Sequence, residues 1–153
     1  MSDSFYKLIP RTTYFDTRGD LTEILHDVDL PVAEDYPHPK FGQVYVVRNE
    51  LPLTVRAFHR HNSLWDFFTV VSGRARVWLI SDSLQIKDFI LSSKVMATLV
   101  IPPSVWHGWQ SLEANTIMVC TGTHRYNRDQ PDEERVDPHY FSKLNVRWGV
   151  EAR

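Results

Sequence analysis

The stretch that decides the fold is "RAFHRHNSLWDFFTVVSG", residues 56–73. It contains two extended segments rich in aromatic and β-branched residues, and a turn at Asn62–Ser63 separates them. Alternate side chains of a strand share one face, so His59 and His61 point to the same side. Asp66 opens the next strand. These three side chains could hold a metal ion, move protons or simply solvate a surface.

Similar extended segments recur on both sides of this stretch. Including its two strands, they cover residues 21–27, 42–47, 53–61, 66–72, 74–81, 84–91, 97–101, 105–112 and 115–122. About nine strands at this spacing predict a β-sandwich or a small barrel. A 3.6-residue apolar pattern is weak throughout, and only "DQPDEER" (129–135) is predicted to form one short helix.

The length of 153 residues predicts a single domain, residues 1–153, with room for a core and a pocket. We expect the barrel to span residues 21–122. The flanking segments, an N-terminal arm (1–20) and a C-terminal arm (123–153), contain Pro, charged and aromatic residues. We expect these arms to pack on the barrel or on a second subunit.

Charge and composition exclude several classes of protein. The net charge is −2 with both signs scattered, which argues against a nucleic-acid partner. The single Cys120 cannot form an intrachain disulfide. The N-terminus lacks the pattern of a signal peptide, and no apolar run reaches the roughly 20 residues of a membrane span. We therefore expect a cytoplasmic protein without a membrane partner.

A second histidine segment, "IPPSVWHGW" (101–109), supplies His107 at the start of another strand, after two prolines that fix the entry turn. Imidazoles on the inner face of a small barrel are costly to bury without polar partners. Asp66 and His107 can be those partners. A His-x-His pair alone is more often structural, but the four residues together at these spacings favour a functional site.

The chain resembles the cupins, and in particular the dTDP-4-dehydrorhamnose 3,5-epimerase family. The similar segments are "FDTRGDLTEI" (15–24), "FGQVYVV" (41–47), "VRAFHRH" (55–61), "VVSGRARVWLISD" (70–82), "IPPSVWHGW" (101–109), "THRYNRDQPDEERVDP" (123–138) and "NVRW" (145–148). The resemblance implies an all-β fold, the cupin-type double-stranded β-helix or jelly-roll barrel. It also implies extended N-terminal strands and a C-terminal arm.

The resemblance also implies roles for individual residues. His59 matches the base that removes a proton beside the 4-keto group of the sugar, and Tyr126 matches the acid on the opposite face. The residues that match substrate-binding positions, or lie beside them, are Arg18, Glu23, Gln43, Arg56, His61 and His107. Arginine suits a diphosphate because its planar fork binds two oxygens at once.

Two departures from the family pattern concern this site. Asp66 stands where the family has the lysine that stabilises the enolate, so we expect Asp66 to orient the base instead. Enolate stabilisation would then fall to Arg56, His107 or a metal ion. Strand alternation places Arg56 opposite His59, so both can face the pocket only if a bulge or the strand end intervenes.

The leading hypothesis is an isomerase, a sugar-nucleotide epimerase or keto-isomerase of deoxysugar or polysaccharide biosynthesis. It would move protons at C3, C5 or both positions of a 4-keto-6-deoxy sugar nucleotide, without a cofactor. A base near pKa 7 suits this chemistry, and histidine has that pKa. We also expect a homodimer, in which the long N-terminal strands cover a neighbour's sheet edge.

Two alternatives remain open. The first is a metal-dependent cupin in which His59, His61, Asp66 and His107 bind one divalent transition metal such as Zn, Ni, Fe or Mn. The second is a non-catalytic sugar-binding cupin, which would keep the pocket but need neither an acid nor a base.

Overall fold

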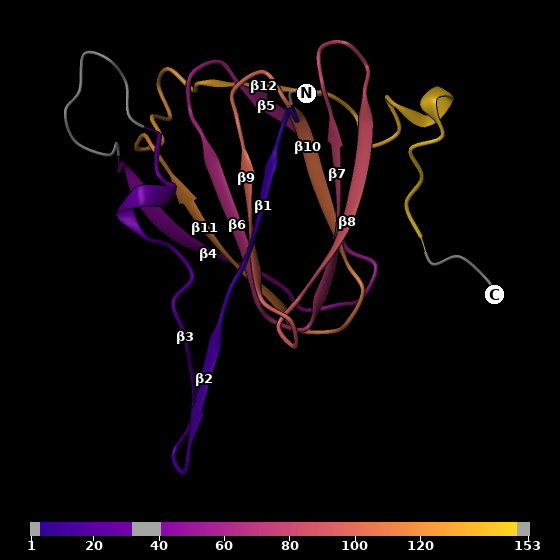
Figure 1. The fold of residues 1–153 in the computed structure, drawn as a ribbon. Helices are drawn as coiled ribbons and strands as arrows, with labels where there is room; N and C mark the ends of the chain where they lie inside the picture. The colour runs from indigo at the N-terminus through magenta and orange to yellow at the C-terminus, as the bar shows by residue number, and fades with distance from the viewer. Residues whose placement is uncertain (1–3, 32–40, 150–153) are drawn as a thin grey trace.

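Two five-stranded antiparallel sheets face each other and form a barrel (Figure 1). The computed structural model describes residues 4–31 and 41–149. The first sheet has the order β1 (Lys7–Pro10), β9 (Ala97–Ile101), β6 (Asp66–Ser72), β11 (Thr116–Gly122), β4 (Gln43–Asn49). The second has the order β12 (Glu133–Arg135), β5 (Val55–His61), β10 (Trp106–Ser111), β7 (Arg74–Ile80), β8 (Ile86–Ser92). This is the predicted all-β, cupin-type jelly roll.

The main core fills the space between the two sheets. Val77, Leu79, Leu99 and Met118 are fully buried there, and they come from strands of both sheets. Each strand turns one face inward, which explains the alternation of apolar and polar residues in the sequence. The space between the two sheets is therefore filled mainly by apolar side chains.

A second apolar cluster lies on the outside of the second sheet. Phe141 and Val146 of the C-terminal arm pack with Phe58, Trp78 and Trp106. The ring of Phe58 meets that of Phe141 edge-on, with centroids 5.1 Å apart. The arm also contains the short 3-10 helix η2 (Ser142–Leu144). The outward face of β5 is thus covered by this arm.

Strand β5 carries a bulge, which is one of the two arrangements that would let Arg56 and His59 share the pocket. His107 of β10 pairs with His59, but Trp109 pairs with Arg56, so two steps on β10 match three on β5. Gly108 lies at the bulge, where an added Cβ would come within 2.3 Å of the Ala57 Cβ. Next to this bulge, Arg56 and His59 line the same cavity, although Arg56 is an exposed residue.

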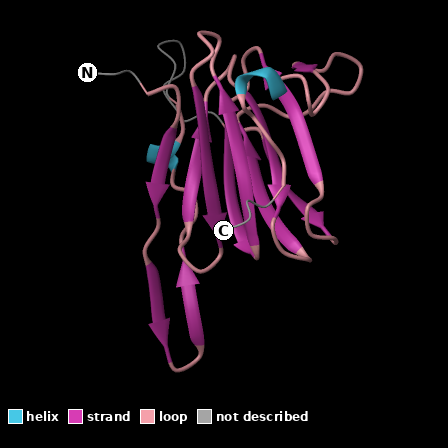
Figure 2. Ribbon diagram, turned by 90° about the vertical axis from the view of Figure 1, so that its right-hand side faces the viewer, coloured by secondary structure: helices cyan, strands magenta, loops and turns pink. Residues whose placement is uncertain are grey.

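The N-terminal segment forms a hairpin that projects from the barrel. Strands β2 (Thr13–Asp16) and β3 (Gly19–Thr22) extend beyond the two sheets in both views (Figures 1 and 2). Tyr14, Phe15 and Leu21 are exposed on this hairpin. Such apolar exposure at the end of a projecting hairpin is typical of a surface that contacts another chain.

Two predictions of local structure were wrong. The strand expected at 21–27 ends at Thr22, and the 3-10 helix η1 (Asp27–Asp29) follows, because Asp29 accepts a hydrogen bond from the His26 backbone. No helix forms at 129–135; the end of this segment, Glu133–Arg135, is strand β12, which pairs with β5. Its polar residues suit an edge strand as well as a helix. Within the described ranges, no helix has the length and apolar character to cross a bilayer.

Candidate active site

A cavity of about 590 Å³ opens between the sheets, and six of the predicted site residues line it. These six are Gln43, Arg56, His59, His61, Asp66 and Tyr126. His107 is 1% exposed and lies behind them, with its ring 4.2 Å from that of His59. The structure therefore brings seven of the nine predicted residues together.

Strand pairing explains this convergence. His59 and His107 lie directly opposite each other on neighbouring strands β5 and β10. In the facing sheet Gly122 pairs with Gln43 on one side and with Asp66 on the other. Tyr126 follows Gly122 by one short turn, and its backbone N–H donates to Gln43 Oε1 at 3.0 Å. Residues far apart in the sequence thus meet at one end of the barrel.

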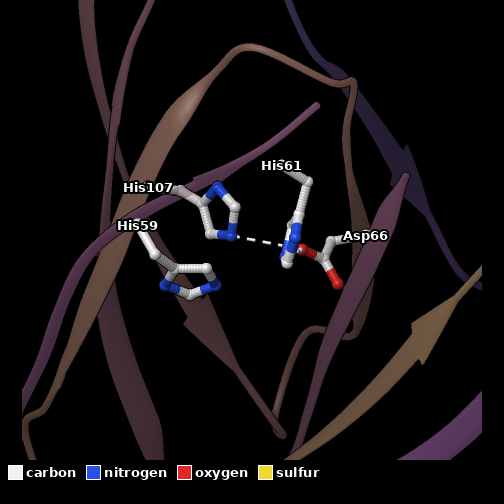
Figure 3. Close-up of side chains that lie close together, drawn as sticks. All are labelled: His59, His61, Asp66 and His107. Carbon is white, nitrogen blue, oxygen red and sulfur yellow. Dashed lines mark ion pairs between the residues drawn. The ribbon is translucent and has the colours of Figure 1, made fainter. Parts of the chain in front are cut away.

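Asp66 lies between two histidines (Figure 3). Its Oδ2 is 3.1 Å from Nε2 of His61 and 3.2 Å from Nε2 of His107. The expectation that Asp66 orients His59 is therefore not met, since its carboxylate pairs with the other two rings. Burial would raise the pKa of Asp66, but His107 and His61 outweigh burial and hold that pKa well below its usual range.

The two partner histidines are held by backbone carbonyls. Nδ1 of His61 lies 2.6 Å from the carbonyl oxygen of Asp132, and Nδ1 of His107 lies 2.9 Å from that of Val105. Burial would lower the pKa of His61, but the Asp66 carboxylate, 3.1 Å away, outweighs burial and raises this pKa. Both rings therefore have a fixed orientation.

His59 differs from its neighbours electrostatically. Burial and then the adjacent His107 lower its pKa to about 2, although the charge of Asp66 acts in the opposite direction. The ring is therefore neutral at physiological pH, which is the state that can accept a proton. His59 also faces the cavity, whereas Arg60 on the opposite face of β5 binds Asp82 and Glu134.

Two lining residues were missed from the sequence. Glu133 and Arg135 of β12 line the cavity, because β12 pairs in register with His61 and His59. Glu133 is nearly buried and binds Arg135, whose side chain is mostly exposed. The only local signal is their two-residue spacing, which resembles that of any polar turn.

Two predicted substrate-binding residues lie elsewhere. Arg18 and Glu23 belong to the projecting hairpin segment and line a separate shallow pocket there. Arg18 is mostly exposed and pairs with Asp16, while Glu23 lies 3.3 Å from His26. Within one chain they do not contribute to the cavity around His59.

One donor atom from each of four residues could also hold a metal ion. The nitrogen atoms of His59, His61 and His107 and a carboxylate oxygen of Asp66 all lie within 4.8 Å of one another. The donor set of imidazoles and one carboxylate suits Zn, Fe, Ni or Mn. The site thus has the residues for either proton transfer or metal binding.

Comparison with known proteins identifies related chains. The family model described as "FdtA: WxcM-like, C-terminal" matches residues 5–137. The spore coat polysaccharide biosynthesis protein SpsL of Bacillus subtilis (strain 168) is 28% identical over 145 residues, covering 90% of this chain and 91% of SpsL.

Two solved structures share the fold at low sequence identity. The 3'-monoepimerase ChmJ of Streptomyces bikiniensis, in complex with dTDP-quinovose, has a TM-score of 0.82 and 14% identity, covering 100% of this chain and 79% of ChmJ. The sugar 3,4-ketoisomerase QdtA of Thermoanaerobacterium thermosaccharolyticum, in complex with TDP, has a TM-score of 0.71 and 20% identity. The match covers 95% of this chain and 97% of QdtA. Both similarities concern the fold.

Proposed function

The chain belongs to the FdtA family of WxcM-like C-terminal domains, and we propose that it is a sugar-nucleotide epimerase or keto-isomerase. Its substrate is a nucleotide-diphosphate-linked 4-keto-6-deoxy sugar. The observation that carries this proposal is the shared cavity, which His59 and Tyr126 line together with Arg56 and Gln43. The name of SpsL supports a place in polysaccharide biosynthesis.

His59 is the proposed base. A proton beside a ketone becomes labile when a base lies within about 3 Å and the enolate oxygen is stabilised. The lowered pKa of about 2 keeps this ring neutral. The negative charge of a bound diphosphate and of the developing enolate would raise the proton affinity of His59 when it is needed.

Tyr126 is the proposed acid. Epimerisation removes the proton from one face of the ring and returns a proton to the other, so it needs a donor opposite the base. The phenol of Tyr126 lines the cavity and remains half exposed, and its backbone is tied to Gln43. A substrate bound between the two side chains would have one on each face.

Arg56 is the proposed diphosphate-binding residue. Arg56 lines the cavity beside the bulge of β5, and its Nε donates to Asn49 Oδ1 at 2.7 Å. This bond orients the fork while leaving further N–H groups for phosphate oxygens. ChmJ, which shares the fold, binds dTDP-quinovose. These observations favour a nucleotide diphosphate sugar as the ligand.

A 3,4-keto-isomerisation is the second candidate, and the histidine cluster favours it. In that reaction the C3 proton leaves, an enediolate forms, and a proton is added at C4 while the C3 hydroxyl becomes a ketone. The rings of His59 and His61 both line the cavity, lie 5.2 Å apart and could move both protons on one face. This reaction does not need Tyr126.

Product analysis in deuterium oxide tests the proposal. A panel of nucleotide 4-keto-6-deoxy sugars is incubated with the protein, and NMR locates the deuterium. Label at C3 or C5 with inversion supports epimerisation, label at C4 with a 3-keto product supports isomerisation, and no label with any substrate contradicts both.

Tyr126→Phe separates the two reactions. For epimerisation we expect at least about a 100-fold loss of inversion, because the opposite-face donor is removed. For isomerisation the rate should stay within about threefold. Tyr140→Phe is the matched control, since Tyr140 is exposed on the C-terminal arm and outside the cavity lining.

The projecting hairpin supports a homodimer as part of this proposal. Arg18 and Glu23 match substrate-binding positions of the epimerase family, yet they lie away from the cavity of their own chain. The hairpin of one chain would reach the cavity of its neighbour and complete the substrate site. The exposed Tyr14, Phe15 and Leu21 would be covered by the same contact.

A further inference from the structure

The hydrogen positions on two buried histidines are settled by their neighbours. Nδ1 of His61 and Nδ1 of His107 each contact a backbone carbonyl oxygen, at 2.6 and 2.9 Å. A carbonyl can only accept, so each Nδ1 carries a hydrogen. In the neutral rings each Nε2 therefore presents a lone pair.

Three acceptor atoms thus meet in the interior. The two Nε2 atoms lie 3.1 and 3.2 Å from Asp66 Oδ2, and the side chains of His61, His107 and Asp66 are 10%, 1% and 2% exposed. Lone pairs that face one another in a buried place are costly without a positive charge between them. Either protons on the rings or a metal ion can provide that charge.

The directions of the groups favour a metal ion. Among the described residues, Asp66 Oδ2 and His107 Nε2 are buried without a hydrogen-bond partner, although they lie 3.2 Å apart. A ring proton shared with the carboxylate would need its N–H aimed at the oxygen. Atoms that coordinate one ion aim instead at a common point beside them.

Two of the three distances between donor atoms, those from Asp66 to each histidine, agree with this interpretation. Ligand atoms about 2.1 Å from one ion stand about 3.0 Å apart at right angles and about 3.4 Å apart at the tetrahedral angle. The observed separations of 3.1 and 3.2 Å fall in that interval. Histidine ligands of metals also commonly donate their other N–H to a carbonyl, as both rings do here.

We propose that His61, Asp66 and His107 bind one divalent first-row transition metal ion. His59 lies beside this set, with its ring near that of His107, and stays free to act as a base (Figure 3). The Asp132 carboxylate supports the site by accepting backbone hydrogen bonds from Ser63 and Leu64 in the β5–β6 turn.

A bound ion would supply Lewis-acid stabilisation of negative charge on the substrate carbonyl, for which Asp66 alone has the wrong sign. This role rests on the proposed function, whereas metal binding does not. The protein itself would hold the three donor atoms rigidly and leave the side of the ion that faces the cavity open to substrate. The metal ion that Asp66 helps to bind would then supply the positive charge that the lysine supplies in the family.

Metal content of the tag-free protein, purified without chelator, tests the proposal. We expect about one equivalent of Fe, Ni, Zn or Mn per chain by mass spectrometry of the metals, and at least about a tenfold loss in His61→Ala and in His107→Ala. His59→Ala and His139→Ala should keep the metal, and His59→Ala should still lose isotope exchange. Metal retained in both ligand variants would overturn the assignment.

A measurement on the unmutated chain covers the case in which those variants fail to fold. After chelator treatment, titration with Co²⁺ should produce visible ligand-field absorption that saturates at about one equivalent and should raise the thermal midpoint. No absorption and no shift with Co²⁺, Ni²⁺, Zn²⁺ or Fe²⁺ would overturn the proposal. Saturable metal binding without isotope exchange on any sugar nucleotide would instead leave it standing and contradict the proposed function.

Discussion

At the scale of single residues, the site depends on side chains whose orientation is fixed by neighbours. His61 and His107 are held by carbonyl oxygens, and Asp66 faces both rings. His59 alone combines a neutral ring with access to the cavity. This division of roles among three histidines follows from which partner each ring has.

Asp132 provides a test at this scale. Its carboxylate accepts hydrogen bonds from the backbone of Asn62, Ser63 and Leu64, and its carbonyl holds His61. Asp132→Ala should lower the free energy of unfolding by about 1–3 kcal/mol, because the N–H groups of the turn, including the part-buried N–H of Leu64, lose a charged acceptor. Urea titration measures the loss. Asp129→Ala, an exposed neighbour, should change stability by less than about 0.5 kcal/mol, and an equal loss in both variants would contradict this role.

The sequence predicted the residue set better than it predicted the pairing within it. Period-two alternation placed His59 and His61 on one face, the second histidine segment added His107, and the resemblance added Tyr126; all of them reach one site. The pairing of Asp66 with His61 and His107 could not be predicted, because Asp66 lies in one sheet and the two histidines lie in the other. Glu133 and Arg135 were missed, since their location depends on pairing with β5 about 70 residues earlier in the chain.

At the scale of elements, the sequence predicted the barrel strands well, but it did not predict the segments outside the barrel. Strands β6 and β9 have the predicted bounds, because both are nearly continuous runs of apolar and β-branched residues that are buried in the sheet. The segment after β3 and strand β12 were predicted wrongly. Both depend on contacts with distant residues, which a local pattern does not contain.

A buried ion pair attaches the N-terminal segment to the barrel. Arg11 binds Asp29 at 2.6 Å, with side chains 6% and 8% exposed, and its Nε donates to Thr98 of β9. Arg11→Ala should lower the free energy of unfolding by about 1–3 kcal/mol, since it leaves the Asp29 carboxylate with only the His26 backbone N–H as a partner. Arg74→Ala removes an exposed pair with Glu113 and should cost less than about 1 kcal/mol.

The effect of Arg11→Ala should depend on pH in a defined direction. Burial would raise the pKa of Asp29, but hydrogen bonds from the His26 backbone and Arg11 outweigh burial and lower it. A lowered folded-state pKa stabilises the fold at pH above the ordinary value of the carboxyl group. That contribution disappears as the pH falls through the folded-state value. The difference between the two chains, measured by thermal unfolding, should therefore shrink below about pH 4, and a growing difference would contradict the pair.

At the scale of the whole molecule, the barrel holds the chemistry and the hairpin is available for contact with another chain. Figure 1 shows β12 at the upper end of the barrel and the tip of the β2–β3 hairpin at the lower end. One chain therefore cannot bring Arg18 to its own His59 without rearrangement. A substrate site shared between two copies would bring both residues to the same ligand.

The oligomeric state tests this account. Sedimentation at micromolar concentration should give a dimer, and replacing both Tyr14 and Phe15 by Ser should give a monomer, because their exposed rings would form the contact. Val95→Ser, which removes an exposed apolar residue from another turn, should remain dimeric. A monomeric parent chain would contradict the shared site.

The most direct test of the central claim is the rate at which solvent deuterium enters the sugar in His59→Ala. His139→Ala is the control, because that histidine is exposed on the C-terminal arm. If His59 is the base for carbon-acid chemistry in this cavity, His59→Ala should exchange at least about 100-fold more slowly than the parent, and His139→Ala should match the parent. Exchange at the parental rate in His59→Ala would contradict the account.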